Sequence, residues 1–245
     1  MSEIVFVMPV YNESQIIANF LEELNIAFSD IPKEFIVVND LSKDDTAKVL
    51  GSLSAKLNIE VINNETNLGH GRSLLRGLNR ALVKKSTFVI AVDGDGHFLG
   101  TDIRKLYNLF TDIQEKLMII EGCRQNRLEP KYRKVTSLMT RLLVWSRCGK
   151  FPKDANTPLR FYKTEALVQL LNATPNESVI PNLHFSSATR KLKMPIRQVP
   201  IDWFNRKGNM ELGTTWGTSK TNLLPSKRFV KFCLSAFSEW IYVKK

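Results

Sequence analysis

Two carboxylates one residue apart follow a strongly apolar run in this sequence. Asp93 and Asp95 belong to the segment Asp93–His97, which comes directly after Phe88–Val92. A buried strand that ends in this way places hard oxygen ligands at the carboxyl edge of a sheet, where open α/β sheets bind their ligands. Such ligands suit Mg²⁺ or Mn²⁺ holding a diphosphate. Because an isolated Asp-x-Asp pair is more often a solvated turn, the assignment depends on the neighbouring segments.

Three other polar segments also follow apolar runs in the first half of the chain. Asp40 offers an acceptor for the N–H of a nucleotide base, and Tyr11 offers a ring face for packing. Gly69 and Gly71 allow a ligand to approach the backbone closely. Each segment taken alone is more often ordinary turn or cap chemistry. Together they predict a nucleotide pocket with a metal at its phosphate end, built from Pro9–Glu13, Asn39–Thr46, Asn67–Gly71 and Asp93–Asp95.

The elements that must position these loops alternate along the first 120 residues. Short β-branched runs predict strands, and the segments between them have the spacing of amphipathic helices. This alternation favours a parallel sheet covered by helices on both faces. Ser42 is the predicted N-cap of the second helix. The predicted strands are Ile4–Met8, Phe35–Val38, Ile59–Ile62, Phe88–Val92 and Met118–Ile120, and the predicted helices are Glu13–Phe28, Asp44–Leu57, Gly71–Val83 and Asp102–Phe110.

Size, charge and cysteine content narrow the class of protein. The chain has 245 residues, 43% of them hydrophobic, which is enough for a substantial core. Its net charge of +11 favours nucleotides, lipid phosphates, acidic membrane surfaces or nucleic acid as partners. The three cysteines are scattered without metal-ligand spacing, so we expect them to stay reduced in the cytosol. With no signal peptide and no apolar run of about 18 residues, we expect a soluble or peripheral protein.

Two amphipathic segments occupy the second half of the chain. Residues 124–147 carry seven basic residues and one acid, Glu129. The last segment, from Phe229 to Ile241, repeats apolar residues at helical spacing and is flanked by basic residues. Each helix either packs on the core with a solvated basic side or lies on a phosphate or membrane surface, and the sequence leaves both open. The apolar face predicted for the first consists of Val135, Leu138, Met139, Leu142 and Leu143.

The motifs occur in the order and spacing of a known family. Pro9–Glu13, Asp40–Thr46, Asn67–Gly71 and Asp93–His97 resemble those of the family-two glycosyltransferases with the GT-A fold. Later segments are similar to the branch of dolichol-phosphate mannose synthases and undecaprenyl-phosphate glycosyltransferases. The resemblance covers roughly residues 4–210. It implies a Rossmann-like, mixed but mainly parallel sheet over residues 1–210 and an extension, 211–245, with an amphipathic helix. The later segments are Gly122–Arg124, Asp154–Lys163 and Val199–Arg206.

The resemblance also implies roles for individual residues on the donor side. Asp93 would lie against the ribose and the metal, and Asp95 would bind the metal. His97 stands where these synthases often have Gln, and either side chain presents a neutral ligand atom, so Asp93, Asp95 and His97 form the expected metal set for Mg²⁺ or Mn²⁺. The residues expected to hold the nucleoside are Pro9, Tyr11, Glu13 and Asp40.

On the phosphate and acceptor side, the resemblance points to basic residues. Arg124 and Arg206 match residues that face the diphosphate or the acceptor phosphate. Arg160 and Asp154 match the acceptor-side segment, where Asp154 is a candidate base or a residue that orients Arg160 or caps a turn. Arg133, from the basic segment, completes the expected acceptor-binding set with Arg124 and Arg160.

Three departures from the family pattern stand out. Asn39 occupies the position of the first Asp of a paired Asp-Asp. The stretch Arg206–Asn209 only partly matches an Arg-x-x-Gly-x-Ser-Lys loop. The transmembrane helices that many relatives carry after the catalytic domain are missing, so membrane access is expected to depend on the basic surface, the final amphipathic helix or a separate anchor protein.

The reaction implied by the resemblance is transfer of a sugar, with inversion, from a UDP- or GDP-sugar. A phosphate monoester is already anionic near pH 7, so a polyprenyl phosphate needs no base, whereas a sugar hydroxyl does. Relatives that glycosylate hydroxyls often present a Glu-Asp pair, and no Glu-Asp dipeptide occurs here. The excess of Arg and Lys after residue 122 suits an anionic acceptor. We therefore expect a polyprenyl phosphate acceptor at the cytoplasmic face of a membrane.

Three alternatives to this expectation remain at the level of sequence. The first is a transferase that acts on a saccharide hydroxyl in surface-polysaccharide assembly. The second is a basic nucleic-acid-binding module, although no helix-turn-helix or RNA-recognition signature appears. The third is an inactive transferase fold acting as a scaffold, which the presence of both Asp93 and Asp95 disfavours.

Overall fold

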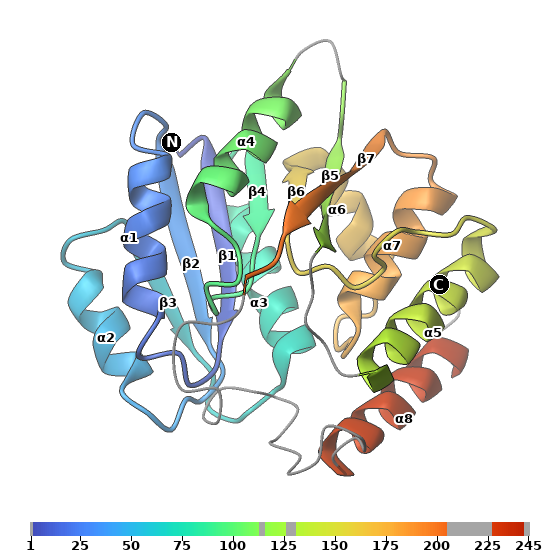
Figure 1. The fold of residues 1–245 in the computed structure, drawn as a ribbon. Helices are drawn as coiled ribbons and strands as arrows, with labels where there is room; N and C mark the ends of the chain where they lie inside the picture. The colour runs from blue at the N-terminus through green and yellow to red at the C-terminus, as the bar shows by residue number, and fades with distance from the viewer. Residues whose placement is uncertain (1, 113–115, 126–130, 205–226, 243–245) are drawn as a thin grey trace.

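One seven-stranded sheet organises the molecule, as the computed structural model in Figure 1 shows. The structure describes residues 2–112, 116–125, 131–204 and 227–242, without the side chains of 131–133 and 228. The strand order is β3-β2-β1-β4-β6-β5-β7, and among these strands only β6 runs antiparallel to its neighbours. The strands are β1 (Ile4–Val10), β2 (Lys33–Asn39), β3 (Ile59–Asn63), β4 (Phe88–Ala91), β5 (Ile119–Gln125), β6 (Arg160–Lys163) and β7 (Ile196–Asp202).

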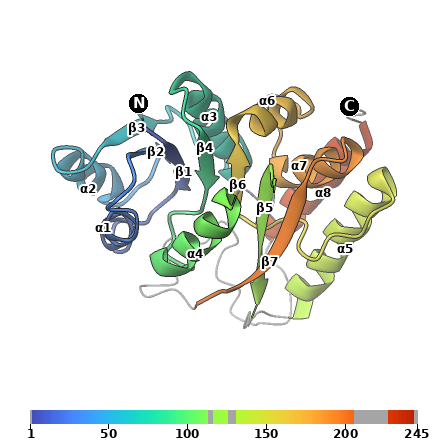
Figure 2. The same cartoon turned by 90° about the horizontal axis from the view of Figure 1, so that it is seen from above.

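Helices cover both faces of this sheet (Figure 2). On one face, α1, α2 and α4 pack against the side chains of Phe6, Phe35 and Ile90. On the other face, α3, α6 and α7 pack against Val7 and Val38. The described helices are α1 (Ile17–Ala27), α2 (Thr46–Leu53), α3 (His70–Val83), α4 (Gly100–Thr111), α5 (Lys131–Cys148), α6 (Thr164–Asn172), α7 (Pro181–Lys191) and α8 (Lys227–Tyr242).

The central strands are apolar on both faces because both faces are covered. Every residue of β1 and of β4 is buried, which is the pattern of parallel strands enclosed between two helical layers. The predicted parallel sheet with helices on both faces is therefore confirmed. Each predicted strand and helix of the first 120 residues is present, with ends shifted by a few residues.

One predicted cap is wrong. The helix α2 begins at Thr46, so Asp45 stands at its N-cap position. The Asp45 side chain makes no capping hydrogen bond. Ser42 instead accepts a hydrogen bond from the backbone N–H of Asn12, across 2.9 Å. The Ser42 hydroxyl therefore joins two loops and does not cap the N-terminus of α2.

The helices α5 and α8 form a third apolar cluster beside α7. Trp240 of α8 packs with Val144 of α5 and Leu183 of α7, and the Arg147 guanidinium lies 3.7 Å from the centre of the Trp240 indole. The C-terminal helix thus docks on the domain through one side. The predicted boundary at residue 210 lies outside the described residues. None of the described helices is both long and apolar enough to cross a membrane.

Of the apolar face predicted for α5, only Leu143 packs against a buried cluster, where it is partly buried. Val135, Leu138, Met139 and Leu142 are each about half exposed, while the neighbouring Val144 is fully buried. Helical spacing identifies a stripe of apolar residues but does not say whether another element covers it. In this fold α7 and α8 contact α5 on the side of Val144, which leaves the stripe open.

Candidate nucleotide and metal site

The polar loops converge at the carboxyl edge of the sheet. β1, β2, β3 and β4 are parallel, so the segments that follow them all emerge at this edge. β6 is antiparallel, so its first residue, Arg160, and the segment before it lie at the same edge. The order of the strands reverses between β1 and β4, and such a switch point is where open α/β sheets form a crevice. The loops after β1 and β4 flank it.

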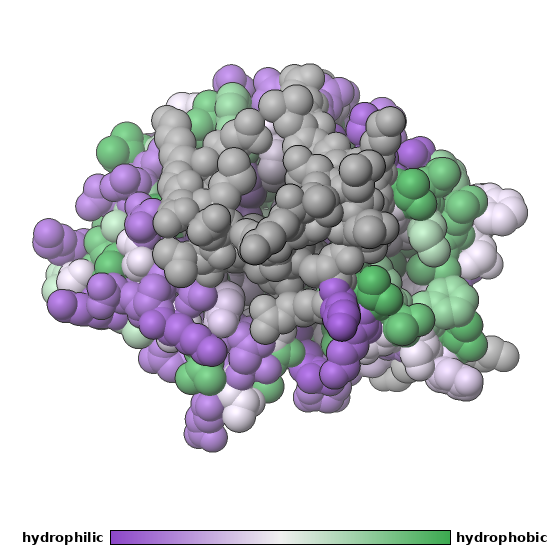
Figure 3. Space-filling model, turned by 60° about the horizontal axis from the view of Figure 1, so that its bottom comes forward, coloured by the Kyte–Doolittle hydropathy of each residue, from purple (hydrophilic) through white to green (hydrophobic). Residues whose placement is uncertain are grey.

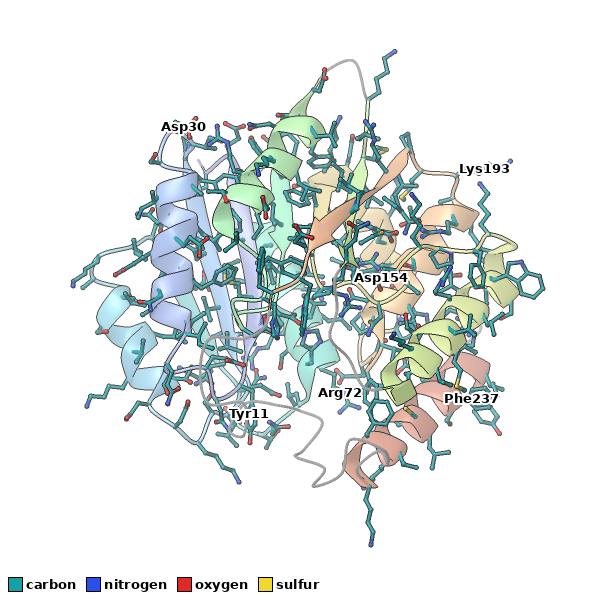
Figure 4. All side chains as sticks on the ribbon, in the orientation of Figure 1. Tyr11, Asp30, Arg72, Asp154, Lys193 and Phe237 are labelled. Carbon is teal, nitrogen blue, oxygen red and sulfur yellow. The ribbon has the colours of Figure 1, made fainter. Side chains whose placement is uncertain are left out.

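Hydrogen bonds join the loops that follow β1 and β2. The backbone N–H of Glu13 donates to Oγ1 of Thr46 at 2.8 Å, and that of Ser14 donates to the Asp44 carboxylate at 3.1 Å. In return, the N–H of Lys43 donates to Oδ1 of Asn12 at 2.8 Å. These bonds connect residues about thirty positions apart in sequence. They fix the loop that carries Tyr11, which is partly exposed at this edge (Figure 4).

Of the residues expected to hold the nucleoside, Pro9 and Glu13 are buried and Asp40 is almost fully buried. The Asp40 carboxylate accepts hydrogen bonds from the backbone N–H groups of Leu68 at 2.8 Å and Gly69 at 2.9 Å. It also accepts one from the Asn64 amide at 2.8 Å. A carboxylate offers about four acceptor positions, so most of those of Asp40 are occupied by hydrogen bonds that hold the loop before α3. Gly69 takes φ = 84° there, a conformation that favours glycine.

The first carboxylate of the pair is bound to a histidine. Nε2 of His70, the first residue of α3, lies 2.7 Å from Oδ1 of Asp93. Burial opposes ionisation of Asp93, but the charges of His70 and Arg124 outweigh it and hold the pKa of Asp93 below its usual value. His70 was part of a recognised motif in the sequence but carried no assigned role. Its place at the start of a helix at the same sheet edge is the signal that could have indicated this contact.

The second carboxylate has the opposite environment. Burial and the neighbouring charge of Asp93 raise the pKa of Asp95 to about 6. Gly94 holds the two residues close to β1, because a Cβ at this position would lie 2.4 Å from Cγ1 of Val10. Two like charges are thus kept close together in a partly buried place, an arrangement that a cation stabilises.

His97 faces Asp95 and is oriented by the two residues that follow β7. Its Nδ1 lies 2.7 Å from the carbonyl oxygen of Phe204, and because a carbonyl only accepts, Nδ1 carries the proton. Its Nε2 lies 3.5 Å from Oδ2 of Asp95, and the indole of Trp203 stacks on the imidazole with ring centres 4.0 Å apart. A histidine held in this way by its other nitrogen is typical of a metal ligand.

The donor set fits Mg²⁺ or Mn²⁺ held jointly with a diphosphate. Among the described residues, no three His, Cys, Asp or Glu side chains gather closely enough to hold a metal by themselves. The expected set of Asp93, Asp95 and His97 therefore does not complete the coordination of a metal by itself. In addition, Asp93 is in contact with His70. One or two carboxylates completed by substrate phosphates is the usual coordination of Mg²⁺ in such sites.

Arg124 and Asp154 form a bidentate ion pair at the same edge. Nε of Arg124 donates to Oδ2 of Asp154 at 2.8 Å, and Nη2 donates to Oδ1 at 3.1 Å. The backbone N–H of Asn156 also donates to this carboxylate at 3.2 Å. Asp154 therefore orients Arg124 and caps a turn. The hydrogen bonds of the Arg160 guanidinium go instead to other groups, among them Glu121 and the carbonyl oxygen of Ala155. A carboxylate held by a guanidinium is a weak proton acceptor.

The expected contact between Arg160 and the acceptor is wrong. Arg160 is fully buried, and its Nη1 lies 2.7 Å from Oε1 of Glu121, which is fully buried as well. Arg190 approaches the other oxygen of Glu121 at 2.9 Å. Arg160 thus has a structural role and does not face a ligand. Arg206 lies outside the described residues, and the side chain of Arg133 does too.

Comparisons with known proteins identify the family of the chain. Residues 5–162 match the model of glycosyl transferase family 2. The chain is 29% identical over 172 residues to an uncharacterized protein of Methanocaldococcus jannaschii, covering 66% of this chain and 72% of that protein. It is 24% identical over 205 residues to the undecaprenyl-phosphate 4-deoxy-4-formamido-L-arabinose transferase of Klebsiella pneumoniae, covering 82% of this chain but only 61% of the transferase.

Solved structures share the fold. Glucosyl-3-phosphoglycerate synthase from Mycobacterium tuberculosis, in complex with Mn²⁺, UDP and glucosyl-3-phosphoglycerate, superposes with a TM-score of 0.62 at 18% identity, over 85% of this chain and 73% of that one. A mannosyltransferase from Pyrobaculum calidifontis, in complex with GDP-Man and Mn²⁺, gives 0.60 at 16% identity, over 100% of this chain and 65% of that one. These neighbours show the GT-A fold, and the family match over more than half of the sequence shows that this chain belongs to glycosyl transferase family 2.

Proposed function

We propose that the protein transfers a sugar from a nucleoside-diphosphate sugar to a polyprenyl phosphate, with inversion and with the help of Mg²⁺ or Mn²⁺. A phosphate oxygen of the acceptor attacks the anomeric carbon while the bond from that carbon to the diphosphate breaks, and the nucleoside diphosphate leaves. We place the reaction at the cytoplasmic face of a membrane, with a UDP- or GDP-linked donor. Family membership favours an enzyme over the nucleic-acid-binding module considered from composition.

The residues at the sheet edge supply what this reaction needs. Asp93 and Asp95 would hold the cation, with His97 beside Asp95, and a bound cation would neutralise charge on the departing diphosphate. Arg124 is held in place by its hydrogen bonds to Asp154 and presents a preorganised positive charge near Asp93. Preorganised charge of this kind is usually the largest catalytic contribution.

The ion pair of Arg124 and Asp154 is the observation that carries the choice of acceptor. A hydroxyl acceptor needs a carboxylate to take its proton, but Asp154 is buried and bound by a guanidinium through both oxygens. A phosphate acceptor is already anionic at neutral pH and needs no such base. The Klebsiella relative, whose name gives undecaprenyl phosphate as its substrate, supports the same choice.

The test is a transfer assay with a panel of UDP- and GDP-sugars, Mn²⁺ or Mg²⁺, and undecaprenyl or dolichyl phosphate in detergent. We expect a glycolipid whose anomeric configuration is opposite to that of the donor, and no product when the cation is chelated. The unphosphorylated polyprenol is the matched control, and it should give no product. Product that forms only on saccharides or on lipid-diphosphate sugars would refute the proposal and favour a transferase of surface-polysaccharide assembly.

A further inference from the structure

The C-terminal helix α8 is apolar on two sides. One side packs on the domain, where Trp240 is only 4% exposed. The other side carries Val230, Leu234, Phe237 and Ile241, with exposed fractions of 44%, 66%, 49% and 47%. Their spacing of four, three and four residues places them on one face of the helix. Phe237 marks this face on the side of α8 away from the sheet in Figure 4.

The neighbouring helix α5 exposes a second apolar stripe. Val135, Leu138, Leu142 and Trp145 are 58%, 49%, 46% and 51% exposed, and they repeat every three or four residues. α5 contacts α8 through Arg147 and Trp240, so the two stripes lie on adjacent helices. Figure 3 shows hydrophobic residues gathered on the side of the molecule where these helices lie. We call the two stripes together the α5–α8 face. Exposed apolar surface gathered on neighbouring helices is typical of an interaction site.

The charged residues of α5 and α8 themselves are basic with one exception. Glu239 is the only acidic residue in the sequences of the two helices. Its carboxylate turns inward, where it accepts hydrogen bonds from the backbone N–H of Val179 at 2.8 Å and from His184 at 2.8 Å. The side chains of Lys134, Lys227 and Lys231 are exposed. The face is therefore apolar in its stripes and positive at its border, which complements an anionic lipid surface and not a second copy of the same positive face.

We propose that the α5–α8 face docks on an anionic membrane surface, with its apolar stripes in the headgroup–acyl boundary and its lysines at the lipid phosphates. The inference deepens the proposed function, since it would bring the carboxyl edge to a lipid-linked acceptor. Tyr11 at that edge and Phe237 on α8 both lie in the lower half of Figure 4, Tyr11 to the left and Phe237 to the right. Docking itself requires neither donor nor cation.

The test is sedimentation of the full chain with vesicles of phosphatidylcholine, alone or mixed with phosphatidylglycerol. We expect binding to the anionic vesicles that weakens with salt. The double variant Leu234→Ser, Phe237→Ser should lower the vesicle partition coefficient by about tenfold or more, because it removes apolar area from the interface. The variant Lys227→Glu, Lys231→Glu should lower it by about tenfold or more on anionic vesicles only.

Matched controls come from other faces of the molecule. Ile26→Ser with Val83→Ser removes apolar residues that are 73% and 63% exposed on α1 and α3. Lys48→Glu with Lys56→Glu reverses two exposed lysines in and after α2. Both controls should bind vesicles as the unmodified protein does, and all variants should keep its melting temperature within a few degrees. Equal binding by the α8 variants and the controls would overturn the inference.

Two further outcomes separate this inference from the proposed function. Transfer to polyprenyl phosphate in detergent, without binding to anionic vesicles at low salt, would overturn the docking inference and leave the function intact. Vesicle binding that depends on the α5–α8 face, without any transfer, would overturn the proposed function and leave the docking inference intact. A dimer that Leu234→Ser with Phe237→Ser dissociates, with no vesicle binding, would show that a second copy covers the face and would also overturn docking on lipid.

Discussion

The two acidic residues after β4 differ in what surrounds them. Asp93 has a histidine at 2.7 Å and a nearby guanidinium, which favour its charged form. Asp95 has the charge of Asp93 as a neighbour and a histidine only at 3.5 Å, so its pKa is raised. The side chain with the weaker protein partners is the one left to bind a cation. We therefore propose that Asp95 is the main protein ligand of the cation and that Asp93 supports it.

The variant Asp95→Asn tests this assignment. Replacing the carboxylate by a neutral amide should weaken Mn²⁺-dependent binding of UDP or GDP by at least about 10–100-fold. Substituting a residue that only hydrogen-bonds to a metal ligand already weakens metal binding by that factor, and Asp95 would be a ligand itself. Binding measured by calorimetry with Mn²⁺ and with a chelator gives the cation-dependent part. Asp102→Asn on α4, which loses a carboxylate that faces Lys105, is the control. Unchanged cation dependence in Asp95→Asn would refute the assignment.

The elements achieve what single residues cannot, because each brings one loop to the same edge. The parallel strands deliver the first four loops, and the reversed direction of β6 delivers the segment that carries Asp154. The turn after β4 is pressed against the end of β1. A Cβ on Gly94 would lie 2.4 Å from Val10 Cγ1 and 3.1 Å from Ile17 Cδ1, so the position of the acidic pair depends on the packing of two other elements.

Gly94→Ala should therefore destabilise the fold, by about 1–3 kcal/mol, because it overpacks a buried contact. Adding Val10→Ala makes room, so the double variant should be more stable than the sum of the two single changes predicts. The free energy of unfolding in urea measures both. Gly51→Ala in α2, where a Cβ would meet nothing within 4 Å, is the control and should be stabilising by about 0.5–1 kcal/mol. Additive effects of Gly94→Ala and Val10→Ala would contradict the clash.

At the scale of the whole molecule, a buried charge cluster connects three neighbouring strands with one helix. Glu121 of β5 contacts Arg160 of β6, Arg190 of α7 and Gln198 of β7, the last at 2.7 Å. Burial disfavours the charged form of Glu121, but the two guanidinium groups outweigh it and lower its pKa. The cluster joins the part of the sheet beyond β4 to the helix behind it.

Glu121→Gln should lower the free energy of unfolding at pH 7 by about 3–5 kcal/mol, because two buried guanidinium groups lose their counter-charge. The pH dependence follows from the lowered pKa. The contribution of Glu121 is complete above the ordinary Glu pKa of about 4.3 and is lost as the pH falls through the lower folded value. The difference between the unmodified protein and Glu121→Gln should therefore shrink in acid.

Glu60→Gln is the surface counterpart of this experiment. Glu60 also lies between two cations, at 2.6 Å from Arg80 and 2.7 Å from Lys84, but these side chains are partly exposed. Its loss should change stability by only about 0–1 kcal/mol. Equal effects of the two substitutions, measured in urea at pH 7, would show that burial of Glu121 is not what makes the cluster matter.

Much of the fold and of the site could be predicted from local patterns. Apolar runs such as Phe88–Val92 and the helical spacing between them determined the parallel sheet, because burial on both faces requires that composition. The loops with Asp40, Asp93 and Asp95 followed from the sheet, since parallel strands end at one edge. The positions of these residues in the chain were sufficient to predict the sheet and the edge at which the loops meet.

Only the tertiary structure decided which partner each side chain meets. Arg160 matched a motif as an acceptor contact, yet β6 places it opposite Glu121 in the core. His70 had no assigned role, yet the pairing of strands brings it to Asp93. The apolar stripe of α5 lies open because α7 and α8 cover the other side of that helix. Spacing along the chain fixes the face of an element on which a residue lies, whereas its contacts depend on segments far away in sequence.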